Sequence, residues 1–247
     1  MKLYLGSRDY RPEGFLCVDV DPKFQPDILA DVADLRSIAS GTVEEVCASH
    51  VLEHIAWPRA FLALSEWTRV LRVGGRLRVA VPDMAALATM IAEGRNVWGA
   101  AGIVFGVGRL DIALEAHQYG YTRAMLIQML QTLGYGDFDW WKHDLPDASN
   151  GWLLDDDGRR IALSLDIQAD KKGPPLVPPK ALYEALAANR LRPFDQVVME
   201  ILAESPAESI NWDLPDNPLL TQRMHMALIE ARMRVLHLEQ QMARTAA

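Results

Sequence analysis

The sequence predicts an α/β protein with a mostly parallel sheet, an antiparallel strand near the C-terminal edge of that sheet, and a helical C-terminal extension. Residues 2–22 have the pattern of a strand, a glycine-containing loop and a strand, and residues 42–83 that of strand, helix and strand. Two later strand-like runs, at 136–145 and 159–171, are separated by the polar turn DDDGR. A crossover helix makes its two strands parallel, whereas a short turn makes them antiparallel.

The first strand pair encloses a loop that begins at Gly6. The second apolar run of the pair, FLCVDV, ends in acidic residues that include Asp19. In open α/β sheets a ribose-bearing ligand lies across such a loop, and the carboxylate after the second strand accepts hydrogen bonds from the ribose hydroxyls. The pattern therefore indicates a nucleotide-type binding loop.

The connection between these two strands is too short for a crossover helix, because a parallel crossover normally takes about a dozen residues or more. One face of the sheet should then lie bare beside the loop, and a bare apolar face is unfavourable in proportion to its area. We expect the helices after residue 180, from this chain or from a partner subunit, to cover that face.

The segment 42–83 predicts the next two strands. VEEVCAS is strand-like, PRAFLALSEWTRVLR begins with proline and has apolar residues at helical spacing, and RLRVAVPD alternates like a strand. The carboxyl ends of parallel strands meet at one edge, where ligands bind. At that edge we expect the Gly6 loop, Ser49, His50 and Asp83 to converge.

The middle of the chain predicts two more helices around a glycine-rich stretch. Residues 84–94 are helix-like, and the glycines of 98–110 indicate a flexible lid or a bent loop. Thr122 can cap the helix RAMLIQMLQTLG, which should end at Gly134. The strands 136–145 and 159–171 then complete the sheet as an antiparallel pair.

The domain organisation follows from the proline-rich segment KGPPLVPP. We predict a sheet domain over residues 1–172, a linker over 173–180, and a helical extension over 181–247 that covers the sheet or mediates oligomerisation. Helical segments are expected near 180–190 and 194–204, followed by a terminal helix.

Charge and composition exclude several classes of partner. The net charge is −8 and no run of lysine and arginine occurs, which argues against nucleic acid as a partner. No apolar run is long enough to insert across a membrane. Cys17 and Cys47 lie in apolar strand-like runs, and the N-terminus lacks the pattern of a signal peptide. We therefore expect reduced thiols and a cytoplasmic location.

Several motifs together resemble the class I S-adenosylmethionine-dependent methyltransferases. They are LYLGS at 3–7, VDVD at 18–21, ADVADL at 30–35, ASHVLEHI at 48–55, RVLRVGGRLRVAVPD at 69–83 and HQYGYTRAMLIQMLQTLGY at 117–135. The resemblance covers residues 2 to about 172 and implies a Rossmann-like fold with S-adenosylmethionine as cofactor. The sequence is similar to a subgroup of small bacterial methyltransferase-like proteins that is often linked with surface polysaccharide synthesis.

The resemblance also implies roles for individual residues. Gly6 and Ser7 would belong to the cofactor loop, and Asp19 would contact the ribose. Asp31 and the backbone of Val32 would contact the adenine. Ser49 and His50 would line the face where the methyl group is transferred.

Arg8 stands where the family's glycine-rich loop has its second glycine, and two interpretations remain open. Its guanidinium could close over the cofactor's carboxylate as a bidentate clamp. Alternatively, Arg8 pairs with Asp9 or Glu13 at the surface, or blocks the pocket.

Methyl transfer from a sulfonium requires alignment and desolvation, and no metal is needed. If the acceptor is a hydroxyl, a base should lie within hydrogen-bonding reach, and the candidates are His117, His50 and Asp83. We favour His117, because it precedes a helix and follows the glycine-rich stretch. His54 lies four residues after His50, a spacing that suits metal ligands on a helix, but the sequence shows no third ligand nearby and we expect no metal.

The terminal helix suggests a different class of function. Apolar residues recur at heptad spacing in Met224, Leu228, Ala231, Val235, Leu238 and Met242. A homodimer through residues 220–243 is possible on this pattern, and the protein could be a non-catalytic scaffold or partner in a glycan-synthesis complex. A helix with one apolar stripe can equally pack on its own domain.

Asp19, Asp31 and the glycine-rich stretch favour an enzyme, because an inert scaffold has little physical reason to keep them. We predict S-adenosylmethionine-dependent methyl transfer to a small-molecule or glycan acceptor, with a hydroxyl as the accepting group. Trp140, Trp141 and Trp152 would suit stacking on a sugar. A dehydrogenase is a weaker alternative, because the G-x-G-x-x-G pattern is absent.

Overall fold

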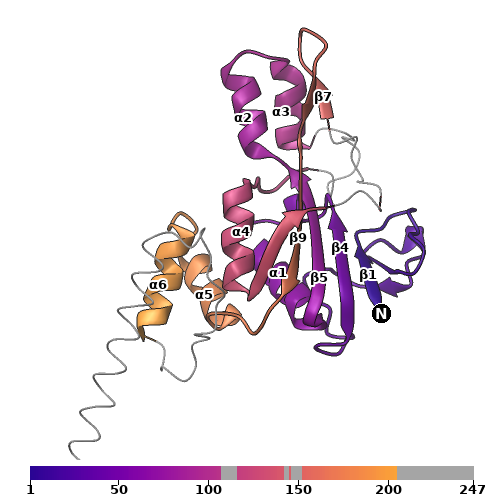
Figure 1. Ribbon diagram of the computed structural model, residues 1–247, viewed down its shortest axis with the longest axis vertical. Helices are drawn as coiled ribbons and strands as arrows, with labels where there is room; N and C mark the ends of the chain where they lie inside the picture. The colour runs from indigo at the N-terminus through magenta and orange to yellow at the C-terminus, as the bar shows by residue number, and fades with distance from the viewer. Residues whose placement is uncertain (107–115, 142–144, 146–151, 205–247) are drawn as a thin grey trace, which may run out of the picture.

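The computed structural model of the protein describes residues 1–106, 116–141, 145 and 152–204, and is built on a seven-stranded sheet (Figure 1). The strand order is β3-β2-β1-β4-β5-β9-β6. The strands are β1 (Lys2–Leu5), β2 (Leu16–Asp19), β3 (Ile28–Leu29), β4 (Val43–Ser49), β5 (Leu71–Pro82), β6 (Tyr135–Trp140) and β9 (Ser164–Lys171). The pairs among β1 to β5 are parallel, and β9 is antiparallel to both of its neighbours, β5 and β6. The predicted Rossmann-like sheet with an antiparallel strand near its C-terminal edge is confirmed.

The strand order reverses between β1 and β4, which places a topological switch point there. The registers pair Leu5 with Ala48 and Ala48 with Val79, so the carboxyl ends of three strands lie together. Ligands of open α/β sheets bind in the crevice outside the carboxyl ends of the strands at such a point. The predicted convergence of the segments after β1, β4 and β5 on one edge is therefore confirmed.

Two helices cover one face of the sheet: α1 (Arg59–Val70) and α4 (Arg123–Thr132). Phe61, Leu64 and Trp67 of α1 recur at helical spacing and are fully buried in the main core. Thr122 caps α4 as predicted, because its hydroxyl accepts a hydrogen bond from the amide of Met125 at 3.4 Å. The core between this face and the helices contains Leu3, Leu5, Val46, Ala48, Leu77, Val79, Val81 and Ile167 from the sheet.

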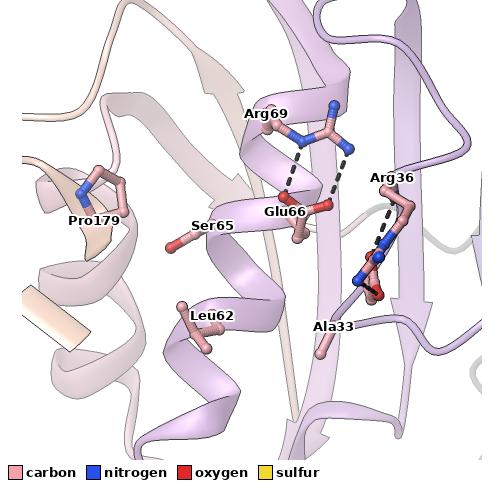
Figure 2. Close-up of a pocket in the computed structure, with 8 residues that line it drawn as sticks. Ala33, Arg36, Leu62, Ser65, Glu66, Arg69 and Pro179 are labelled. Carbon is pink, nitrogen blue, oxygen red and sulfur yellow. Dashed lines mark hydrogen bonds and ion pairs between the residues drawn. The ribbon is translucent and has the colours of Figure 1, made fainter. Parts of the chain in front are cut away.

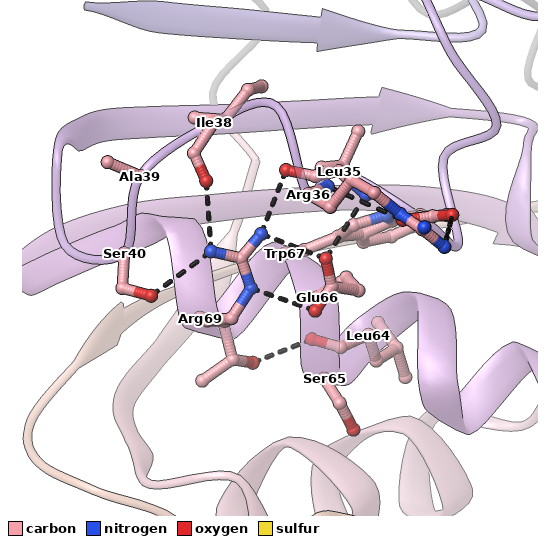
Figure 3. A network of polar contacts seen from close by, with 12 residues as sticks. Leu35, Arg36, Ile38, Ala39, Ser40, Leu64, Ser65, Glu66, Trp67 and Arg69 are labelled. Carbon is pink, nitrogen blue, oxygen red and sulfur yellow. Dashed lines mark hydrogen bonds and ion pairs between the residues drawn. The ribbon is translucent and has the colours of Figure 1, made fainter.

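A polar network holds the loop before β4 against α1 (Figure 3). The guanidinium of Arg69 donates to the carbonyls of Leu35 and Ile38 at 2.8 and 2.9 Å, and to the hydroxyl of Ser40 at 3.1 Å. It also donates to both carboxylate oxygens of Glu66, at 2.8 and 2.9 Å. One side chain of α1 therefore satisfies the backbone of a loop that has no regular partner strand.

Helices α5 (Pro179–Ala188) and α6 (Phe194–Glu204) agree with the helical segments expected after residue 180, and they pack outside α1 (Figure 1). The ring of Phe194 lies 5.7 Å from that of Phe61 and 6.2 Å from that of Trp57, measured between centroids. The segment expected to be a linker is packed as well, because Leu176 and Val177 are buried in the main core. The predicted boundary near residue 172 remains a prediction.

The other face of the sheet carries no helix among the described residues, and its side chains are largely polar. Lys2 pairs with Glu45 at 2.8 Å, and Glu45 pairs with Arg78 at 3.0 Å, across three adjacent strands. We expected the helices after residue 180 to cover a bare apolar face. For residues 181–204 this expectation is wrong, because α5 and α6 do not lie on that face. They lie on the α1 side, and the opposite face is occupied by charged pairs and by a small apolar cluster of Tyr4, Cys47, Ala80 and Trp141.

The glycine-rich stretch forms a helix, which corrects the expectation of a lid for its described part. α2 (Met84–Ala92) and α3 (Val97–Phe105) pack together above the carboxyl edge of the sheet (Figure 1). The Asn96 side chain caps α3 by accepting from the amide of Gly99 at 3.1 Å, and Gly106 ends it with a φ of +68°. The small residues allow the close packing of α3 that a flexible loop would not need.

The turn DDDGR joins a different pair of strands from the one expected. It connects β7 (Trp152–Leu154) with β8 (Arg160–Ala162) in a separate small hairpin. β6 and β9 are antiparallel neighbours as predicted, but the connection between them is longer and contains this hairpin. Among the described residues, none of the helices has both the length and the apolar character needed to span a bilayer.

Candidate functional site

The loop after β1 is shaped by a glycine that the structure requires. Gly6 has a φ of +63°, and its amide donates to the carbonyl of Val18 at 2.8 Å. A Cβ atom at Gly6 would lie 2.5 Å from Cγ2 of Val51, which follows β4. The backbone of β1 therefore approaches the segment after β4 as closely as it can, at the switch point of the sheet.

The carboxylate of Asp19 connects this loop to the end of β2. Its Oδ2 accepts from the amide of Arg8 at 2.8 Å, and its Oδ1 accepts from the amide of Asp21 at 2.9 Å. Asp19 is only 5% exposed, so these bonds compensate much of the cost of burying its charge. Each oxygen has a second lone pair that can accept from a hydroxyl of a ligand.

Arg11 is a residue of this loop that the sequence reasoning missed. Its guanidinium donates to the carbonyls of Arg8 and Tyr10 at 2.6 and 2.9 Å, and to those of Phe24 and Gln25 in the loop after β2. Arg11 thus joins the loop after β1 to the loop after β2, where no crossover helix is present to hold the connection in place. The sequence feature that could have identified this role is an arginine within a connection too short for a helix.

The guanidinium of Arg8 lies over the ring of Phe24, 5.6 Å from its centroid. Neither interpretation of Arg8 included this cation–π contact. The backbone of Arg8 has a φ of +50°, which turns its amide toward Asp19. Arg8 thus adopts the left-handed backbone region, which a glycine occupies more readily than an arginine.

The segment after β3 contains the residues expected to contact an adenine. Oδ1 of Asp31 accepts from the amide of Ala33 at 2.9 Å, and its Oδ2 pairs with Arg59. The carbonyl of Val32 accepts from the indole of Trp67 at 2.9 Å. Its amide has no hydrogen-bond partner within the described ranges and can donate to a ligand.

His50 forms the centre of a hydrogen-bonded chain at the end of β4. Nδ1 lies 3.0 Å from Oε1 of Glu53, and Nε2 lies 3.2 Å from the hydroxyl of Ser164. That hydroxyl donates to Asp166 at 2.5 Å, so it accepts from Nε2. Both ring nitrogens of His50 are therefore engaged by neighbouring side chains. Ser49, next to His50, is buried.

Beside this chain, Glu53, His54 and His117 form a cluster. Each residue offers one ligand atom, and these atoms all lie within 4.8 Å of one another. The imidazole rings of His54 and His117 are 4.9 Å apart and meet edge to face. The sequence showed no third metal ligand near His54, because His117 becomes a neighbour only in the folded chain.

His117, the favoured base, is held by the C-terminal end of α3. Its amide donates to the carbonyl of Phe105 at 3.2 Å, and its ring hydrogen-bonds to the backbone of Ile103. Burial lowers the pKa of His117, and the nearby carboxylate of Glu53 partly opposes this shift. The imidazole is therefore neutral at neutral pH.

Tyr121 lies close to the same cluster and is fully buried. Burial, followed by the charge of Glu53, raises the pKa of Tyr121 far above its ordinary value, so its hydroxyl keeps its proton. That hydroxyl has no hydrogen-bond partner in the part of the chain that the structure describes. It is a buried donor near Glu53 that the sequence reasoning did not identify.

Asp83 has a role in the fold. Its carboxylate caps α2 by accepting from the amides of Ala85 and Ala86 at 2.9 and 3.4 Å. Its assignment as a base stays a prediction.

Aromatic side chains are exposed on α3, β6 and β7. Trp98 of α3 is 91% exposed, and Phe105, Trp140 and Trp152 are also exposed. Figure 1 shows α3 and β7 above the carboxyl edge of the sheet. Trp141, in contrast, is buried in a small cluster on the polar side of the sheet and cannot lie at a pocket rim.

A separate cavity of about 710 Å³ lies between the loop after β3, α1 and the start of α5 (Figure 2). It is lined by Ala33, Asp34, Arg36, Leu62, Ser65, Glu66, Arg69 and Pro179. None of the predicted site residues lines it, and its charged groups are paired with one another, as Glu66 is with Arg69. The chemistry-bearing residues are at the strand ends instead.

Residues 11–79 match the sequence model of a family described as a methyltransferase domain. The matched segment contains Asp19, Asp31, Ser49 and His50. The match supports a methyltransferase enzyme, and S-adenosylmethionine as its cofactor, in agreement with the prediction. None of the curated proteins matches the sequence.

Solved structures of similar proteins include methyltransferases from several organisms. A SAM-dependent methyltransferase from Archaeoglobus fulgidus has a TM-score of 0.47 at 16% identity, covering 69% of this chain and 85% of that one. The YcgJ protein from Bacillus subtilis has a TM-score of 0.45 at 13% identity, with coverages of 70% and 92%. A SAM-dependent methyltransferase from Methanosarcina mazei has a TM-score of 0.44 at 13% identity, with coverages of 69% and 91%. The fold assignment itself rests on the strand order and directions of this chain.

Proposed function

We propose that the protein transfers a methyl group from S-adenosylmethionine to a hydroxyl of a small-molecule or glycan acceptor. The observation that carries the proposal is the close approach of two features at the switch point. The Gly6 loop with Asp19 lies on one side, and the histidine-rich segment after β4 lies on the other, with Gly6 packed directly on Val51.

The residues at this edge fit the cofactor. Gly6, Ser7 and Arg8 would surround its amino-acid part, Asp19 would accept from the ribose hydroxyls, and the Val32 amide would donate to the adenine. The close packing of Gly6 and the remaining lone pairs of Asp19 support this fit. When bound, S-adenosylmethionine supplies an electrophilic methyl group on a positively charged sulfur.

The side chains after β4 and before α4 would handle the acceptor. His117 would take the proton of the acceptor hydroxyl, whose oxygen would receive the methyl group that the cofactor supplies. A neutral imidazole has the free lone pair that this step requires, and burial keeps His117 neutral. His50, already engaged at both nitrogens, would orient Glu53.

Further parts of the proposal rest on exposed aromatics and on composition. Exposed rings on α3 and β7 suit stacking on a sugar, which favours a glycan and a role in polysaccharide biosynthesis. Cys17 and Cys47 are both buried and neither belongs to a disulfide, which supports a reducing compartment such as the cytoplasm. The proposed homodimer through residues 220–243 lies outside the described residues.

The first test is calorimetric titration of the full chain with S-adenosylhomocysteine, the product that retains the cofactor's nucleoside. We expect Asp19→Asn to weaken binding by about 10–100-fold, because each charge-assisted hydrogen bond contributes about 1.5–3 kcal/mol. Asp21→Asn is the matched control, since its carboxylate contacts Lys23 at the surface and should change binding less than about twofold.

Thermal unfolding of both variants without ligand shows whether either has lost its fold. Absence of binding by the unmodified protein would contradict the proposal. So would equal losses in the two variants, because Asp19 would then have no specific part in the site.

A further inference from the structure

We propose that Glu53, His54 and His117 bind a divalent transition-metal ion of the zinc class. The three ligand atoms already lie within 4.8 Å of one another. Tetrahedral zinc with bonds of about 2.0–2.2 Å places its ligand atoms roughly 3.3–3.6 Å apart, so the most separated atoms of the cluster would move together by about 1 Å on binding. The sequence alone predicted no metal, and this juxtaposition revises that expectation.

The cluster is held together by the backbone and not by long side chains alone. The amides of Gln118 and Tyr119 both donate to the carbonyl of Glu53, at 2.7 and 3.2 Å. The segment before α4 is thereby fixed against the segment after β4. His117 is therefore placed beside Glu53 and His54 by hydrogen bonds that need no ligand.

Two atoms of the cluster are buried and without a hydrogen-bond partner within the described residues: Oε2 of Glu53 and Nδ1 of His54. Glu53 is only 1% exposed, and His50 engages its other oxygen. A buried carboxylate oxygen without a hydrogen bond is unfavourable, and a bound cation compensates it directly. The two unpartnered atoms belong to adjacent residues that share the cluster.

The outer partners of these side chains are those that metal ligands usually have. A ligating histidine generally donates its other ring nitrogen to a carbonyl or carboxylate, and a ligating carboxylate is itself hydrogen-bonded. His117 hydrogen-bonds to the backbone of Ile103, and Glu53 accepts from His50 at 3.0 Å. Both contacts fix the orientation of the inner groups.

The donor set selects the kind of metal. Two imidazoles and one carboxylate suit Zn²⁺ and similar transition metals, whereas Mg²⁺ and Ca²⁺ prefer oxygen ligands throughout. Three protein ligands leave a position open for an oxygen of a substrate. The assignment of that position to the acceptor hydroxyl rests on the proposed function, but metal binding itself does not. A bound metal would engage the lone pair of His117, so this imidazole could take the hydroxyl proton only in the metal-free protein.

The test is calorimetric titration of the chelator-treated full chain with ZnCl₂. We expect one tight equivalent, and at least about 100-fold weaker binding in Glu53→Gln and in His117→Ala. His50→Gln, a change to a positioning residue, should weaken binding by about 10–100-fold. Glu44→Gln is the matched control for Glu53→Gln, because it removes an exposed carboxylate at the start of β4, which pairs with the N-terminal ammonium, and should leave the affinity unchanged.

Visible absorption of bound Co²⁺ provides a second readout, and thermal unfolding of each metal-free variant shows whether it has folded. Failure of the unmodified chain to bind Zn²⁺ would overturn the proposal. Equal affinity of Glu53→Gln and the unmodified chain would do the same, as would losses of affinity that are equal in Glu44→Gln and Glu53→Gln.

Titration of the same metal-free protein with S-adenosylhomocysteine separates the two proposals. Binding of the nucleoside without binding of Zn²⁺ overturns only the metal site. Binding of Zn²⁺ without the nucleoside supports the metal site and overturns the proposed methyl transfer.

Discussion

At the scale of single residues, the left-handed backbone of Gly6 matters most for the site. A Cβ atom there would overlap Cγ2 of Val51, and the stiff branched side chain of valine cannot easily move aside. The conformation and the contact are separate constraints, because φ depends on the backbone and the overlap depends on Val51. A substitution pair can therefore separate them.

We predict that Gly6→Ala lowers the free energy of unfolding by roughly 2–5 kcal/mol, through backbone strain and overpacking. Gly14→Ala is the matched control, because Gly14 also has a positive φ, of +79°, but a methyl group added there would meet nothing within 4 Å. Gly14→Ala should lower the free energy of unfolding by only about 1–2 kcal/mol. Denaturant unfolding measures both.

Adding Val51→Ala to Gly6→Ala should restore the part of the lost unfolding free energy that comes from the overlap with Val51. A double-mutant cycle would show this as coupling between the two substitutions. If Gly6→Ala and Gly14→Ala prove equally destabilising, the close approach of the loop to Val51 is not important for stability.

At the scale of elements, α1 stabilises the loop between β3 and β4 through Arg69 (Figure 3). That loop follows the residues expected to contact the adenine, so its position affects the shape of the site. The planar guanidinium reaches two carbonyls, a hydroxyl and a carboxylate at once, which the single ammonium of lysine cannot do.

We predict that Arg69→Lys lowers the free energy of unfolding by about 1–3 kcal/mol, because several charge-assisted hydrogen bonds are lost. Arg36→Lys is the matched control, since Arg36 forms an exposed pair with Asp34 and the change should leave the midpoint of urea unfolding nearly unaltered. Equal stabilities of the two variants in urea would contradict the anchoring role of Arg69.

The helix α3 illustrates how an element can differ from its sequence pattern. Gly99 and Gly102 suggested flexibility, but the cap at Asn96 and packing against α2 stabilise a helix there. Propensity is a weak guide where tertiary packing is available. The difference has a functional consequence, because the end of α3 holds His117.

At the scale of the whole molecule, the sheet and the helices after residue 172 share one core. The buried apolar side chains of this part are Leu176, Val177, Leu182, Leu186, Val197, Val198 and Leu202. Burial of such a side chain contributes about 1.5–3 kcal/mol, so together they rival the whole net stability of about 5–15 kcal/mol.

We predict that a chain ending at Lys172 will not unfold cooperatively, whereas a chain ending at Glu204 will retain a sharp thermal transition. Calorimetry of the two chains tests this expectation. A shared melting temperature would instead support a domain boundary at residue 172.

The sequence by itself determined the features that depend on local pattern. Strand VEEVCAS, the helix after Pro58 and the cap at Thr122 follow from periodicity and capping chemistry, which act over a few residues. The position of Asp19 at a strand end also followed, because parallel strands align their carboxyl ends.

Only the tertiary structure decided which distant groups meet. His117 is far from Glu53 and His54 in the chain, and no local pattern records the backbone bonds that bring them together. Arg11 and the charged pairs of the helix-free sheet face are likewise invisible to periodicity, because their partners lie on other elements. Hydrogen bonds and charges act through space, and only folding sets those distances.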